Sequence, residues 1–178
     1  PAVHWLDYRT WSTWERPSLR LPNPLLDTAG VWMDDQGVML TVGGSTDDHK
    51  QDSVTSSQYQ IRLVDPVRGK PAMVGTLTHP LDEPGVAWNA SRQVAYAVGE
   101  HGPQGFRPAI REVLPSGLNR VVGTLPVGMD NLVAVYEGPY LYILGGRAPG
   151  QVPEISDGSD TIYRWDPRSG GEAVLMEA

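Results

Sequence analysis

The sequence contains no cysteine. A disulfide scaffold, thiol catalysis and a cysteine-ligated metal site are therefore all excluded. Lysine is nearly absent, so arginine carries most of the positive charge, which we interpret as a hint of a GC-rich, bacterial genome. The net charge of −7 provides no basic stripe for phosphates, and the longest apolar runs are far shorter than a bilayer is thick. Neither a nucleic acid nor a membrane is an expected partner, and the compartment stays open.

Glycine and proline are abundant instead. The 178 residues include 20 glycines and 16 prolines, which interrupt almost every stretch of helical length. A hydrophobic content of 40% is enough for one domain of this length to bury a core. The composition predicts an all-β chain without long helices.

One pattern recurs three times along the chain. In each copy an apolar strand ends in glycine, at Gly43, Gly99 and Gly145. The copies lie about 50 residues apart, a period typical of β-propeller blades, in which each small sheet must stack on its neighbours. The turn at 65–69, in which proline follows aspartate and glycine closes the turn, recurs at 166–170. We predict a propeller of four-stranded antiparallel blades.

The predicted strands follow from alternating and continuous apolar runs between turn residues. They are 30–33, 38–43, 59–64 and 72–77 in the first copy, 86–88, 93–99, 109–114 and 120–125 in the second, and 132–136, 140–145, 161–165 and 172–176 in the third. The blades are 23–80, 81–126 and 127–178. Residues 1–22 resemble only the outer half of an earlier blade.

Further residues recur with this pattern: the glycine doublets Gly43-Gly44 and Gly145-Gly146, Tyr59 and Tyr163, Trp165-Asp166-Pro167, and Leu21-Pro22-Asn23-Pro24. Together they resemble the kelch-repeat β-propeller family over essentially the whole chain. There are two departures: Glu100 stands where the family's second glycine is expected, and the outer-strand tryptophan is kept only as Trp14, with Ala72 and Ala173 at its other positions. Because they recur at equivalent positions, the glycines are expected to be structural and the two tryptophans to lie in the core, namely Gly43, Gly44, Gly99, Gly145, Gly146, Trp32 and Trp88.

The predicted blade count leaves the propeller incomplete. About three and a half blades are present, whereas a propeller ring needs about four or more. Open sheet edges and uncovered apolar faces favour association. We therefore expect another protein chain, a second copy or further residues to complete the propeller.

The long loops that follow the second strand of each copy, 45–57, 100–108 and 147–159, are the predicted binding elements. A solvated loop tip is the simpler interpretation of their charged residues, and Trp5, Trp11 and Trp14 fit packing better than sugar stacking. A metal site on His49 and His101 is disfavoured, as is calcium at 157–160, so no metal or cofactor is predicted. The candidate partner-binding or ligand-binding residues are Asp47, Asp48, His49, His101, Arg107, Arg147, Glu154 and Asp157.

Two functions fit these observations. The first is a binding or scaffolding propeller, a protein-interaction module or a subunit of a larger assembly. The alternative is a carbohydrate enzyme that resembles the bacterial kelch-type sialic-acid mutarotases. In that case Glu100, with Arg107 or Arg147, would hold a small acidic or carbohydrate ligand and move a proton.

Overall fold

The computed structural model describes residues 2–7, 9–20, 27–46, 58–67, 69, 71–102, 105–149 and 160–176. Every regular element in this part of the chain is a β-strand, so the predicted all-β class is confirmed. Three four-stranded antiparallel units follow one another along the sequence, preceded by a two-stranded hairpin. The hairpin joins β1 (Ala2–Asp7) to β2 (Ser12–Arg20).

The first sheet has the strand order β3-β4-β5-β6. Its strands are β3 (Ala29–Met33), β4 (Val38–Val42), β5 (Gln58–Val64) and β6 (Pro71–Leu81). The first three match their predicted bounds closely. The fourth continues past the predicted end at residue 77, and Gln58 of β5 still pairs with Leu81 at its far end.

The second sheet has the order β7-β8-β9-β10 and gains a fifth strand at its outer edge. Its strands are β7 (Gly85–Asn89), β8 (Val94–Gly102), β9 (Gly105–Val113) and β10 (Asn119–Thr124). The loop predicted at 100–108 is wrong. Strands β8 and β9 extend through most of this segment, and Gly102 of β8 pairs with Gly105 of β9.

The third sheet has the order β11-β12-β13-β15. Its strands are β11 (Asp130–Glu137), β12 (Tyr140–Arg147), β13 (Ile162–Trp165) and β15 (Val174–Leu175). The predicted strand 172–176 is divided in two, because β14 (Gly171–Glu172) pairs in parallel with β10 of the second sheet instead. The chain thereby links the outer edges of the second and third sheets.

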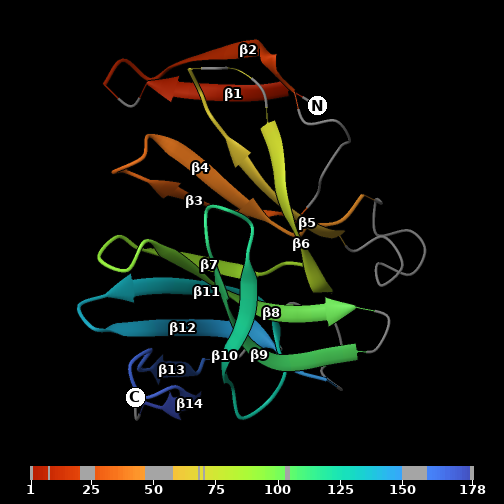
Figure 1. Ribbon diagram of the computed structural model, residues 1–178, viewed down its shortest axis with the longest axis vertical. Coiled ribbons are helices and arrows are strands. Elements are labelled where there is room, and N and C mark those ends of the chain that lie inside the picture. Colours follow the sequence, from red (N-terminus) through yellow and green to blue (C-terminus); the bar gives the residue numbers. More distant parts are fainter. Residues whose placement is uncertain are drawn as a thin grey trace.

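The sheets stack one after another along the long axis of the molecule, with the hairpin at one end and the third sheet at the other (Figure 1). The first strands of the three sheets are neighbours, with β3 against β7 and β7 against β11. One apolar core lies between the first and second sheets, and another between the second and third. Strand β8 is buried on both faces because it belongs to both cores, as its continuous apolar sequence predicted.

The repeated Asp-Pro turns are confirmed as equivalent structures. In the first, Gly69 N–H donates to the Asp65 carbonyl at 3.0 Å, and Gly170 N–H donates to the Asp166 carbonyl at the same distance. Each aspartate carboxylate also accepts a backbone N–H two residues ahead, which fixes the start of the turn. Both closing glycines have positive φ, as the turn requires.

The expected core position of Trp32 is wrong, because its side chain is 44% exposed. Trp88, at the equivalent position, is half-buried, and its indole N–H donates to Asp35 of the first sheet. The first sheet covers that face of the second sheet. Trp32 projects from the face of the first sheet that points away from the second, where no complete sheet lies among the described residues.

Candidate functional site

The strands β3, β7 and β11 begin at the same end of the stack, and we call this end the mouth. Each strand is introduced by a polar residue with positive φ: Asp27 (+53°), Glu83 (+49°) and Asn131 (+56°). Each lies at the same distance in sequence before an aromatic residue, namely Trp32, Trp88 and Tyr136, so the three are equivalent in the repeat. Side chains other than glycine rarely adopt this backbone conformation, and such residues concentrate at binding sites.

The three equivalent residues surround one pocket. It has a volume of about 250 Å³, and its other walls come from residues at or just before the start of the same strands, including Thr28, Pro84 and Leu132. Asn131 N–H donates to the Glu83 carbonyl at 3.0 Å and so joins the second sheet to the third at the pocket. The pocket exists only because the sheets are stacked.

A buried ion cluster lies beside the pocket. The Asp130 carboxylate accepts hydrogen bonds from Arg147 through Nε (3.1 Å) and Nη2 (2.8 Å). His101 Nδ1 lies 3.0 Å from Asp130 Oδ2, and the His101 ring stacks on Phe106 with 4.2 Å between ring centres. Residues from β8, β9, β11 and β12 are held together in this way.

Carboxylates dominate the electrostatics of the mouth. Burial raises the pKa of Glu83, and the negative charges of Asp130, Asp27 and Asp82 raise it further, while Arg147 opposes them. The hydrogen bonds that Arg147 donates to Asp130 raise the pKa of Arg147, so this guanidinium remains charged. Within the described residues, Glu83 Oε2 is buried without a hydrogen-bond partner. The mouth is suited to a ligand that donates hydrogen bonds and is poorly suited to an acidic one.

The structure brings two of the predicted site residues, His101 and Arg147, together on Asp130. Arg107 lies on β9, with its Nη1 2.6 Å from His79 Nε2 of β6. His101 and Arg107 therefore belong to a strand hairpin, and Arg147 is the last residue of a strand. The remaining candidates lie outside the described residues: Asp47, Asp48, His49, Glu154 and Asp157.

Glu100 is buried inside the second sheet and is not among the residues that line the pocket at the mouth. Its carboxylate accepts hydrogen bonds from Arg111 Nε (2.8 Å) and Nη2 (2.5 Å), although its neighbour across the strand pair is Arg107. The enzyme hypothesis, which needs Glu100 at the ligand, gains no support from this arrangement.

Sequence reasoning missed Asp27, Glu83, Asp130 and Asn131. Asp27, Glu83 and Asn131 could have been found, because each lies at the same distance before the aromatic residue of β3, β7 or β11. Asp130 carried no such signal, because its role depends on side chains that converge from other strands. Among the described residues, no group of three or more histidine or acidic side chains has the arrangement of a metal site. The same part of the chain holds no helix that is long and apolar enough to cross a bilayer.

No family model matches this chain, and no curated protein does either. The interpretation of function therefore depends on the geometry of the molecule itself.

Proposed function

We propose that the chain is part of a kelch-like β-propeller that acts as a protein-interaction module, one subunit of a larger assembly. One observation carries this proposal. The outer face of the third sheet repeats the apolar side chains that the second sheet buries against its neighbour.

Corresponding positions on the two sheets follow from strand pairing. In the second sheet, Val98 lies opposite Ile110, and in the third sheet Leu144 lies opposite Ile162, each pair next to the equivalent glycine. Ile110 is 0% exposed and Ile162 is 39% exposed. The difference arises because the third sheet covers Ile110, whereas no described sheet covers Ile162.

The same relation holds on the innermost strands. Ala87 lies opposite Tyr96, and the equivalent Val135 lies opposite Tyr142. Ala87 is 4% exposed, but Val135 is 47% exposed. The exposed face continues across the third sheet to Val174, which pairs with Arg164. Arg164 lies among these side chains, with its guanidinium 4.7 Å above the Tyr140 ring, so the face is largely rather than wholly apolar. A largely apolar exposed face marks a site of association.

Repeat packing suggests what covers this face. The chain twice stacks one sheet on the next, and the third sheet offers the same surface for a further sheet. Burial of apolar area contributes roughly 25 cal/mol per Å², so a face of this extent strongly favours association. The partner that fits best is another protein chain that supplies a further β-sheet, and a second copy of this chain is the other outcome of the test.

The proposal can be tested by introducing a charged side chain on the outer face of the third sheet. We expect Val135→Glu to abolish binding of an apolar dye by the dilute protein and any self-association seen by sedimentation velocity. Val67→Glu is the matched control, because Val67 is 89% exposed in the turn after β5. Self-association of the wild type would identify a second copy as the partner, and a monomer that binds dye would point to a different chain. A wild-type monomer that binds no more dye than Val135→Glu would contradict the proposal.

A further inference from the structure

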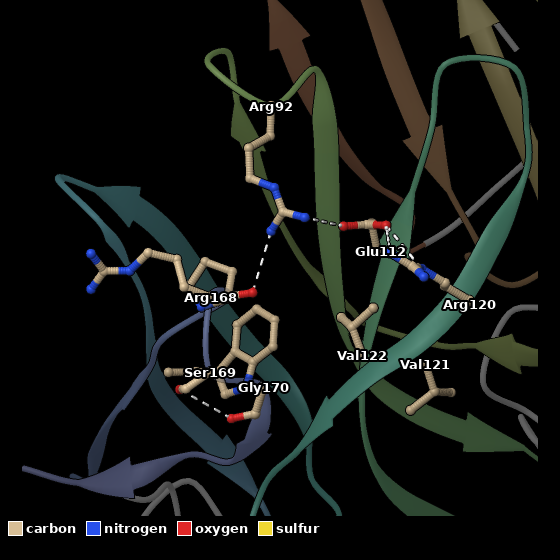
Figure 2. Close-up of a pocket in the computed structure, with 10 residues that line it drawn as sticks. Arg92, Glu112, Arg120, Val121, Val122, Arg168, Ser169 and Gly170 are labelled. Atoms are coloured by element: carbon tan, nitrogen blue, oxygen red, sulfur yellow. Dashed lines mark hydrogen bonds and ion pairs between the residues drawn. The ribbon is translucent and has the colours of Figure 1, made fainter.

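A second pocket lies between the second and third sheets, away from the mouth, and has a volume of about 340 Å³. Figure 2 shows its lining, which combines residues of the β7–β8 turn, β9, β10 and the turn after β13. This size is at the lower end of the range for small-molecule sites, which place a few polar groups over apolar walls.

Two guanidinium groups share one carboxylate at this pocket. Glu112 is buried, and its Oε1 accepts hydrogen bonds from Arg120 Nε (3.1 Å) and Nη2 (2.9 Å). Arg92 Nη2 lies 3.4 Å from Glu112 Oε2. Among the described residues, Glu112 is the only carboxylate that pairs with either arginine. One positive charge is therefore left over, in a chain whose net charge is −7.

The arginines have donors that remain available for a ligand. Arg92 is held in position by Tyr96, whose hydroxyl oxygen accepts from Nη1 at 2.9 Å, and by the Pro167 carbonyl at 3.4 Å. Arg120 places only Nε and Nη2 on Glu112, which leaves its Nη1 without a partner in the described part of the chain. A planar guanidinium with unused N–H groups is suited to binding a carboxylate or phosphate.

Two apolar residues of the lining, Trp165 and Val122, are fixed in place, and Trp165 is 1% exposed and lies beneath the pocket. The Trp165 indole N–H donates to the Gly171 carbonyl at 3.2 Å, and its ring meets Tyr96 edge-on at 5.3 Å. Val122 is the extra residue of a β-bulge, because the register of β10 against β9 shifts between Val121 and Gly123. Bulges redirect side chains and are frequent next to binding sites.

The geometry points to a binding site for a small organic anion, whose carboxylate or phosphate binds Arg92 and Arg120 beside the Glu112 carboxylate and whose apolar part lies against Val122. This site is separate from the mouth and from the open face of the third sheet, so it does not depend on the proposed function. Because it combines residues of two sheets, an occupying ligand would also stabilise their packing.

Arg168 provides a matched control at the rim of the same pocket. Its guanidinium points away from the pocket in Figure 2 and binds both oxygens of Asp166, at 3.0 and 2.7 Å. These hydrogen bonds lower the pKa of Asp166 to about 2, so the pair stays ionised and neutral overall across ordinary pH. Removing this arginine changes the charge of the rim without changing the proposed contacts.

The experiment is a titration of the full ¹⁵N-labelled chain with benzoate, phenyl phosphate and inorganic phosphate, followed through the Trp165 indole N–H and the Gly170 amide. We expect saturable shifts with at least one of the two aromatic probes, and the stronger of these identifies the preferred head group. Arg120→Gln should weaken binding by about tenfold or more, the effect of losing a charge-assisted hydrogen bond. Arg168→Gln should leave the affinity unchanged.

Two results would overturn this inference. One is the absence of saturable shifts with both aromatic probes. The other is equal weakening by Arg120→Gln and Arg168→Gln, which would indicate diffuse attraction to surface charge. Arg120 is mostly exposed, so its substitution should leave the thermal unfolding midpoint in place, and Arg92→Gln serves as a second variant if it does not.

Discussion

At the scale of single residues, the repeated glycines combine two requirements. Gly43, Gly99 and Gly145 all have positive φ, at +67°, +102° and +69°. Gly43 also lies so close to its neighbours that a Cβ atom built on it would come within 2.3 Å of the Leu81 carbonyl oxygen. Gly37 has a similar φ of +65° but no heavy atom within 4 Å of such a Cβ. A substitution at Gly43 therefore tests backbone conformation and close packing together, whereas one at Gly37 tests backbone conformation alone.

We predict that Gly43→Ala lowers the free energy of unfolding by about 3 kcal/mol or more, because left-handed backbone and overpacking both contribute. Gly37→Ala should cost only about 1 kcal/mol, the cost of the backbone conformation alone. Urea denaturation of both variants measures the difference. Equal losses would show that Gly43 and Leu81 do not approach each other as described.

The strand-ending glycines could be predicted from sequence because the backbone itself requires them. The exposure of Trp32 could not, since burial depends on which sheet lies opposite and not on the residue type. Glu100 shows a second limit. Its place at the start of a predicted loop, where a glycine is expected, suggested Arg107 or Arg147 as its partner, but the side chain that reaches its carboxylate is Arg111.

At the scale of elements, most strands were predictable from apolar runs between turn residues. The hairpin formed by β8 and β9 was not, because His101 and Arg107 gave the segment a polar composition typical of a loop. His101 contacts Asp130 of the third sheet and Arg107 contacts His79 of the first, and only the stacked sheets provide these partners. The parallel pairing of β14 with β10 could not be predicted from the sequence either, because it joins two different sheets.

The mouth gives a prediction for pH that belongs to this scale, because the charges around Glu83 come from several elements. Burial and neighbouring carboxylates raise the pKa of Glu83 in the folded protein. The folded state then binds more protons than the unfolded chain between the unfolded pKa and the raised one, so stability falls as the pH rises through this window. Glu83→Gln removes this loss.

We therefore expect Glu83→Gln to be more stable than the wild type at about pH 7, with the difference disappearing as the pH falls below the unfolded pKa of about 4.3. Chemical denaturation at a series of pH values measures both the stability difference near neutral pH and its disappearance at low pH. Glu137→Gln controls for the loss of one carboxylate, because Glu137 is exposed and lies at the far end of β11 from the mouth. A variant that is less stable than the wild type at neutral pH would contradict the description of the mouth.

At the scale of the whole molecule, the stack of sheets explains why burial differs between equivalent positions. The apolar side chains of β8 are covered on both faces, whereas several apolar side chains on the outer faces of the first and third sheets are exposed, including Trp32, Val135 and Ile162. The sequence could predict three similar units but not what lies beyond them, because each copy carries the same apolar pattern whether or not a neighbour covers it. The molecule therefore presents a ready-made packing surface.

Side-chain footprinting of the two equivalent isoleucines tests this claim most directly. In the dilute monomer, a photochemical carbene should label Ile162 strongly and Ile110 scarcely, because the same side chain is open on the third sheet and covered on the second. When the outer face becomes covered by association, Ile162 should become as protected as Ile110. Equal protection of both residues in a monomer, or strong labelling of Ile110, would contradict the account.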